Sequence, residues 1–167
     1  MEFRDIFLKQ KETIRRRTLE VIGNLRPEHM NWRPEKDALS VGEMLQHLWV
    51  SEEGVRRVAL ENNFAYYETR VPDGLRATLG SPRTLDEDFG NLARVHSETI
   101  SAVSSCRSDI FDTERLRPDF GFRRKVWVIL MGINEHEIHH RAQLSTYLRL
   151  MGRPLPDVAK AYRPAPQ

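Results

Sequence analysis

The sequence predicts an all-α protein, a four-helix bundle with a long crossover connection after its second helix. Hydrophobic residues recur at helical spacing in four stretches of roughly 20 to 29 residues, and the proline and glycine clusters fall between these stretches. The connection over 62–82 is unusually long for a compact domain. A connection of this length lets the second and third helices run parallel. We therefore expect one domain over residues 1–167.

Composition and charge exclude several other classes of protein. A hydrophobic share of 40% with 30% charged residues is typical of a globular chain and not of a disordered one. The net charge of only +2 argues against a nucleic-acid partner, and the basic run Arg15–Arg17 shares its helix with Glu12 and Glu20, so we interpret it as a solvated face. No apolar run approaches the roughly 20 residues of a membrane span.

Cysteine content and the N-terminal sequence predict the compartment. Cys106 is the single cysteine, so no internal disulfide can form. The first residues carry too many charges for a signal peptide. Both observations predict a cytoplasmic location.

The first two helices have clear sequence signals at their ends. The first is expected over 3–25, and Pro27 stops it because proline lacks a backbone N–H. The second is expected over 41–61. Ser40 and Glu43 match a capping box, in which the two side chains accept hydrogen bonds from free backbone N–H groups at the helix start.

The last two helices are marked in the same way. Thr84 and Glu87 repeat the capping pattern before a helix expected over 85–104. A second irregular segment, in which we expect little strand, leads to the helix over 123–151. Gly152 provides a glycine cap for that helix, and Pro154 follows it.

Three histidines lie within five residues of the last helix. Because a helix turns about 100° per residue, His136 and His140 share the hydrophobic stripe, whereas His139 points roughly 120° away from it. Two imidazoles at i and i+4 are close enough to bind one metal ion. A single histidine on such a stripe is more often a hydrogen-bonded core residue, but two would leave four ring nitrogens to satisfy. The pair therefore predicts a metal site.

A third ligand has to come from another helix. His47 lies at the edge of the hydrophobic stripe of 41–61, and His96 lies more centrally on 85–104. The helical wheel favours His96, but depth along the bundle also matters, so both residues remain candidates. His29 follows Pro27 in a connection and is expected to be an exposed loop residue.

The segments around these histidines resemble a known family. One segment is SVGEMLQHL, which starts at Ser40, and another is NWRP, which starts at Asn31. The third is HEIHHRAQL, which starts at His136 and is followed by YLR and Gly152. In combination they are similar to the DinB/YfiT-like family of bacterial metalloproteins over nearly the whole chain. The resemblance implies a four-helix bundle with the long crossover, which often pairs as a homodimer.

The resemblance also implies the ligand set. Family members bind a divalent metal through one histidine of the second helix and two of an H-x-x-x-H in the fourth, which corresponds here to His47, His136 and His140. The last two agree with the wheel, and His47 is chosen over His96 by resemblance alone. His96 is then expected to be a core histidine, and His139 a surface residue or a group that supports the site.

The implied activity is metal-dependent S-transfer. Some relatives activate a low-molecular-weight thiol, such as bacillithiol, mycothiol or glutathione, for attack on a small electrophilic substrate. We expect zinc or nickel first, and iron, manganese or copper also suit the site. Two alternatives remain open: hydrolysis by a metal-bound hydroxide, and a non-catalytic stress-response protein that binds a metal or ligand. Neither a nucleic-acid nor a membrane partner is expected.

Two carboxylates fall near the predicted site. Glu137 is a weak candidate to accept a proton or to orient a ligating imidazole. The preferred interpretation is an intrahelical ion pair between Glu137 and Arg141. Glu52 lies near the inner face of 41–61, where a carboxylate needs a partner, and is a secondary candidate for the wall of the site.

Overall fold

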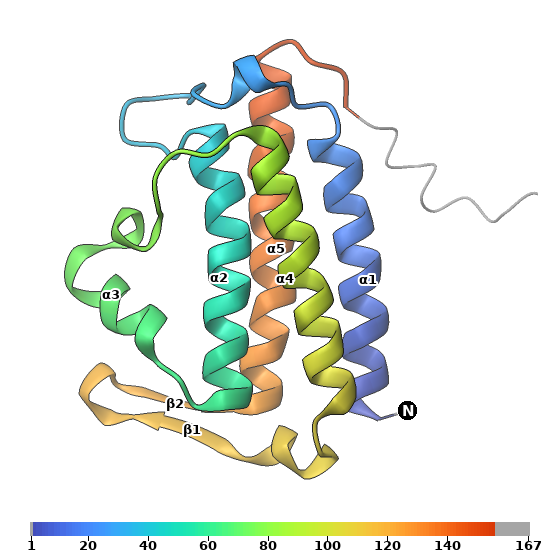
Figure 1. Cartoon of the computed structure of the whole chain (residues 1–167), viewed down its shortest axis with the longest axis vertical. Helices are drawn as coiled ribbons and strands as arrows, with labels where there is room; N and C mark the ends of the chain where they lie inside the picture. Colours follow the sequence, from blue (N-terminus) through green and yellow to red (C-terminus); the bar gives the residue numbers. More distant parts are fainter. Residues whose placement is uncertain (1, 156–167) are drawn as a thin grey trace, which may run out of the picture.

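Four long helices form the core of the computed structural model, which describes residues 2–155. They are α1 (Phe3–Ile22), α2 (Val41–Glu61), α4 (Leu85–Ser105) and α5 (Val126–Leu150). In Figure 1, α1 and α5 run in one direction, and α2 and α4 run in the other. Helix α5 packs against α1 and α2, and α4 packs against the same two helices. The predicted four-helix bundle, with its parallel second and third long helices, is confirmed.

The helix ends follow the signals in the sequence. Ser40 Oγ accepts a hydrogen bond from Glu43 N at 3.2 Å, and Glu43 Oε2 accepts one from Ser40 N at 2.7 Å. Thr84 and Glu87 form the same reciprocal pair at the start of α4. After α5, Gly152 adopts a left-handed φ of 68°, which glycine tolerates without strain. These contacts satisfy backbone groups that helix ends leave unpaired.

The long connection after α2 is structured. It contains α3 (Ala65–Asp73) and the short 3₁₀ turn η2 (Leu75–Thr78). Figure 1 shows α3 beside α2, outside the four long helices. Other 3₁₀ turns are η1 (Pro27–His29), η3 (Ser108–Asp112) and η4 (Pro118–Phe120).

The segment before α5, expected to be irregular, contains a short hairpin that the sequence did not predict. Strands β1 (Glu114–Arg117) and β2 (Phe122–Lys125) form an antiparallel hairpin, with Glu114 opposite Lys125. Because β2 occupies the residues up to 125, α5 begins at Val126 and not at the expected position 123. At the other end of the bundle, α1 stops at Ile22, three residues before the expected end.

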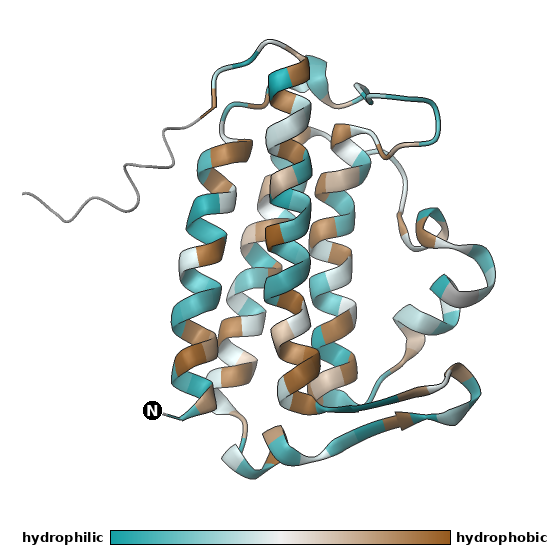
Figure 2. Cartoon of the chain, turned by 180° about the vertical axis from the view of Figure 1, so that it is seen from behind, coloured by the Kyte–Doolittle hydropathy of each residue, from teal (hydrophilic) through white to brown (hydrophobic). Residues whose placement is uncertain are grey.

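The core consists of two hydrophobic clusters separated along the bundle by a polar layer. One cluster includes Ile22, Leu45 and Leu148, and the other includes Phe7 and Leu130. The buried polar residues of this layer include Lys11, Arg15, His47, Glu52, Glu137 and His140. In Figure 2, hydrophobic residues gather at the lower ends of α1 and α5 and alternate with hydrophilic ones along both helices. Within the described residues, no helix is long and apolar enough to cross a membrane.

Candidate metal centre

Three histidines from two helices converge in the polar layer. His47 belongs to α2, and His136 and His140 lie one turn apart on α5. Their ligand atoms all lie within 4.8 Å of one another. The Nε2 atoms of His47 and His136 are 2.8 Å apart, and the three ring centroids are separated by 4.3 to 4.6 Å. The structure thus brings together His136 and His140, which the wheel paired, and His47, which the family resemblance supplied.

Burial keeps these imidazoles neutral. His47 is 2% exposed and His140 is 8% exposed, whereas His136 is half-buried. Burial is the main cause that lowers the pKa of His47 to about 3 and that of His136 to about 2. The charge of Arg70 and the repulsion that would arise if neighbouring rings were protonated together act in the same direction. Burial also lowers the pKa of His140. At neutral pH each ring therefore keeps a free lone pair, which a metal ligand requires.

Hydrogen bonds at Nδ1 orient two of the rings. His140 Nδ1 donates to Gln143 Oε1 at 2.6 Å, and His47 Nδ1 lies 2.9 Å from Ser51 Oγ. When Nδ1 donates the hydrogen bond, the lone pair of Nε2 is available for a metal ion. The donor set contains only neutral nitrogen atoms, which suits zinc and the late first-row transition metals.

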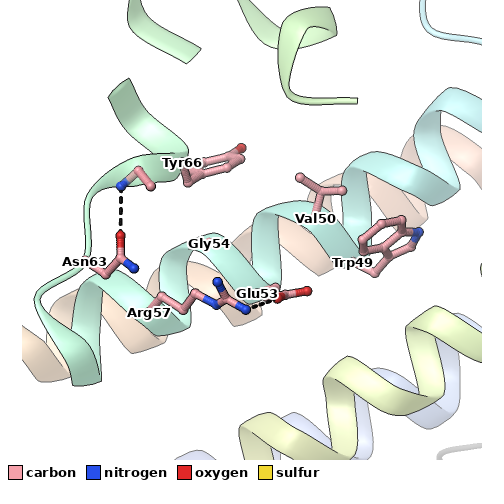
Figure 3. A pocket seen from close by; sticks show the side chains of 8 residues that line it. Trp49, Val50, Glu53, Gly54, Arg57, Asn63 and Tyr66 are labelled. Carbon is pink, nitrogen blue, oxygen red and sulfur yellow. Dashed lines mark hydrogen bonds and ion pairs between the residues drawn. The ribbon is translucent and has the colours of Figure 1, made fainter. Parts of the chain in front are cut away.

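Tyr66 contacts Ser51, the hydrogen-bond partner of His47. Ser51 Oγ also lies 2.9 Å from the hydroxyl of Tyr66 on α3. Gly54 makes this approach possible, because a Cβ atom at that position would lie only 2.4 Å from Tyr66 Cγ. Figure 3 shows the Tyr66 ring above α2 next to Gly54. Neither Ser51 nor Tyr66 was predicted from the sequence: Ser51 had a signal, four residues after His47 on one helix, but Tyr66 lies in a connection and had none.

A cleft of about 290 Å³ opens beside the histidines, between α2, α3, β2 and α5. His136 and Ser51 line it, together with aromatic, aliphatic and charged residues: Glu52, Val55, Tyr66, Tyr67, Arg70, Phe122, Arg124, Val128, Ile129, Gly132, Ile133 and Glu135. A smaller hollow of about 160 Å³, drawn in Figure 3, is lined by Tyr66 and neighbouring residues of α2 but by none of the three histidines. The larger cleft is therefore the approach to the candidate metal centre.

The remaining histidines lie outside the cluster. His96 was expected to be a core residue, but it is half-buried on α4, with Nε2 at 3.3 Å from Glu12 Oε2 on α1. His29 was expected to be exposed, but it is 6% exposed, and its Nδ1 accepts a hydrogen bond from Arg26 N at 3.0 Å. This bond turns the chain after α1, which explains why a loop histidine is buried. His139 is exposed.

The two candidate carboxylates belong to a buried ionic cluster. Glu137 Oε2 lies 2.7 Å from Lys11 Nζ and 3.2 Å from Arg15 Nη2, and Glu52 Oε2 contacts the same two cations at 2.7 and 2.5 Å. The predicted Glu137–Arg141 pair was wrong, because Arg141 Nη1 donates to the backbone oxygen of Ile14 at 3.3 Å.

This cluster also corrects the interpretation of the basic run on α1. Its first residue, Arg15, is 4% exposed and faces the core, so the prediction of a solvated face fails there. Burial by itself would raise the pKa of Glu137, but Lys11 and Arg15 bring it below its ordinary value. A carboxylate held by two cations is a poor proton acceptor, which weakens Glu137 as a candidate base.

Comparison with known proteins identifies similarities in sequence and fold. The family model described as DinB superfamily matches residues 10–144. The Bacillus subtilis (strain 168) protein YjoA is 24% identical over 137 residues, which cover 81% of this chain and 82% of YjoA. The crystal structure of that DinB-like protein superposes with a TM-score of 0.71 at 21% identity, over 90% of this chain and 94% of YjoA.

Two further structures share the fold. A DinB-like protein from Bacillus cereus ATCC 10987 gives a TM-score of 0.69 at 19% identity, over 90% of this chain and 93% of the other. YfiT from Bacillus subtilis gives 0.67 at 13% identity, over 90% and 89%. YfiT is described as a probable metal-dependent hydrolase with an unusual four-helix bundle topology. At such identities these structures establish a common fold only.

Proposed function

We propose that this chain, which belongs to the DinB superfamily, holds one divalent metal ion between His47, His136 and His140 and activates a small thiol there for transfer to an electrophile. The observation that carries the proposal is the convergence of three neutral imidazoles within 4.8 Å. Because neutral ligands leave the charge of an ion uncompensated, the ion lowers the pKa of a bound thiol or water.

The protein residues have separate tasks in this proposal. Ser51 and Gln143 hold the rings of His47 and His140 through their Nδ1 atoms, so that both Nε2 atoms face the cluster. His136 lies at the boundary between the cluster and the cleft, because it is half-buried and lines the cleft wall. A substrate in the cleft therefore approaches the site from the side of His136.

Hydrolysis is the second candidate function. It is favoured by the common fold with YfiT, described as a probable metal-dependent hydrolase. Transfer and hydrolysis require the same three histidines and differ in the nucleophile that enters the cleft. Zinc and nickel are the first metals to test, followed by iron, manganese and copper, because imidazole ligands accept several divalent ions.

Elemental analysis of purified, tag-free protein tests the metal site. We expect about one ion per chain in the wild type, lost in His47→Ala and His136→Ala because two remaining imidazoles bind a metal weakly. His139→Ala and His96→Ala are the matched controls and should retain the ion, since neither side chain belongs to the cluster. Metal retained in His47→Ala, or lost in His96→Ala, would contradict the proposed ligand set.

Turnover assays then separate the functions. Reconstituted protein is incubated with bacillithiol, mycothiol or glutathione and monobromobimane, and metal-dependent thioether formation supports S-transfer. Metal-dependent cleavage of ester and amide substrates, without thioether formation, would favour hydrolysis. A fully loaded protein that is inactive in both assays would favour a non-catalytic binding protein.

A further inference from the structure

We infer that the cleft beside the three histidines binds its substrate through a carboxylate group, and that Arg70 and Arg124 are the residues that recognise it. This inference rests on the proposed function, because it names the substrate class of the same site. It concerns a small molecule that bears a carboxylate and whose reactive group reaches the histidines.

The two arginines come from separate segments and line one cleft. Arg70 belongs to α3 in the crossover connection, and Arg124 belongs to β2 in the hairpin. Figure 1 shows α3 and the hairpin on the same side of the bundle. Two guanidinium groups therefore line the cleft that His136 also lines. A guanidinium binds a carboxylate through two parallel hydrogen bonds, which favours this ligand class over neutral ones.

Neither arginine is neutralised by an acidic side chain in the described part of the chain. Arg70 Nη1 donates to Tyr66 OH at 3.4 Å, and Arg124 Nη1 donates to the backbone oxygen of Arg123 at 2.7 Å. Neighbouring arginines behave differently: Arg117 pairs with Glu68 at 2.6 Å, and Arg123 with Glu114 at 3.0 Å. The cleft arginines thus keep their charge for a ligand.

The acidic residues of the cleft leave an excess of positive charge. Glu52 and Glu135 are the only acids that line it among the described residues. The charge of Glu52 is taken up by Lys11 and Arg15. Two arginines then face one remaining carboxylate, and a divalent ion at the histidines would add further positive charge. Such a cleft concentrates anions.

Arg70 lines the same cleft as His136, one of the three histidines. A guanidinium near a site for a divalent cation is repelled by that cation unless an anion lies between them. The rings of Tyr67 and Phe122 and the side chain of Ile129 provide an apolar wall for the rest of the ligand.

Matched thiols test the inference. N-acetylcysteine carries a thiol and a carboxylate, and N-acetylcysteamine carries the thiol without the carboxylate. Calorimetry on zinc-loaded protein should give about tenfold tighter binding of N-acetylcysteine to the wild type. Arg70→Gln and Arg124→Gln should each remove most of this preference and leave N-acetylcysteamine affinity and zinc content unchanged. Arg123→Gln is the control, since Arg123 does not line the cleft, and should behave as wild type.

A third probe separates this inference from the metal proposal. N-acetylalanine keeps the carboxylate but lacks the thiol, and its binding to chelator-treated protein is followed by NMR titration. If no metal binds, loss of N-acetylalanine binding in Arg70→Gln would still support the carboxylate site. The inference would be overturned, with the metal site left intact, if the wild type bound both thiols with equal affinity. It would also be overturned if the arginine variants lost affinity for N-acetylcysteine and N-acetylcysteamine to the same extent. Absence of N-acetylalanine binding together with absence of metal would overturn both.

Discussion

Lys11 on α1 donates a 2.7 Å hydrogen bond to Glu137 on α5, the residue that follows His136 in the chain. The same Nζ donates to Glu52 on α2 at 2.7 Å, and Arg15 contacts both carboxylates. Two cations and two carboxylates, each at most 4% exposed, thus balance one another beside the histidines. This cluster links the three helices α1, α2 and α5 at the level of the candidate metal centre.

Removing one member of the cluster should destabilise the fold. In Lys11→Met, Arg15 alone would face two buried carboxylates, so we expect the free energy of unfolding to fall by about 3–5 kcal/mol. Lys11→Met combined with Glu52→Gln restores the charge balance and should recover most of that loss. Urea denaturation of the metal-free proteins measures the free energy of unfolding of the single and the double variant.

Lys9→Met is the control, because Lys9 is exposed on the same helix. It should change the free energy of unfolding by no more than about 0.5 kcal/mol. A loss below about 1 kcal/mol in Lys11→Met would show that the buried charges contribute little.

This cluster also shows what a single sequence cannot reveal. Lys11 and Arg15 look like surface residues of an amphipathic helix, since their partners Glu52 and Glu137 lie on other helices. By contrast, His136 and His140 could be paired from the sequence, because their spacing on one helix fixes their relative direction. The capping pairs at α2 and α4 are equally local and were predicted correctly.

The choice between His47 and His96 illustrates a second limit. The wheel gives the angle of a side chain around its helix but not its depth along the bundle, and depth places His47 beside His136. Only the family resemblance supplied this information. The hairpin was missed because ERLR and FRRK are charged on both faces and lack the alternation that marks a half-buried strand.

Ser51→Ala should weaken metal binding. The substitution removes the partner of His47 Nδ1, which frees the ring to rotate and to change tautomer. Loss of such supporting contacts typically lowers metal affinity about 10- to 100-fold. Competition with a fluorescent chelator measures the dissociation constant. Tyr66→Phe, which removes only the outer hydroxyl, should have a smaller effect.

Ser145→Ala is the matched control for Ser51→Ala. Ser145 also lies on a long helix, but its hydroxyl donates to the backbone oxygen of Arg141 and contacts no candidate ligand. The metal affinity of the Ser145→Ala protein should equal that of the wild type. An unchanged dissociation constant in Ser51→Ala would refute the role assigned to this hydroxyl.

Gly54→Ala should displace Tyr66 and destabilise the crossover. The added Cβ would lie 2.4 Å from Tyr66 Cγ, so α3 must shift away from α2. Gly90→Ala is the comparison, because Gly90 also lies inside a long helix and has no neighbouring atom within 4 Å of the added Cβ. Alanine is favoured over glycine in a helix by about 1 kcal/mol, so Gly90→Ala should stabilise the protein. The midpoint temperature of thermal unfolding should therefore fall in Gly54→Ala and rise in Gly90→Ala. A higher midpoint in Gly54→Ala would contradict the close packing of Tyr66 on Gly54.

Acid should destabilise the metal-free protein through its buried histidines. In the unfolded chain a histidine binds a proton near pH 6.5, whereas burial holds the pKa of His47 at about 3 and that of His136 at about 2 in the folded protein. Between pH 6.5 and 3 the unfolded state therefore binds more protons, so the free energy of unfolding falls as the pH drops. Each histidine contributes up to about 1.4 kcal/mol per pH unit.

Urea denaturation between pH 7.5 and 5.0 in the presence of a chelator measures this slope. The range stays above the titration of Glu137, whose lowered pKa adds a loss of stability only in more acidic solution. His136→Gln keeps a neutral polar side chain that cannot titrate, so its slope should be smaller than that of the wild type. His139→Gln, at an exposed position, should leave the slope unchanged. Identical slopes in wild type and His136→Gln would mean that His136 is protonated as readily in the folded protein as in the unfolded chain, and the three rings would then compete with protons for a metal at neutral pH.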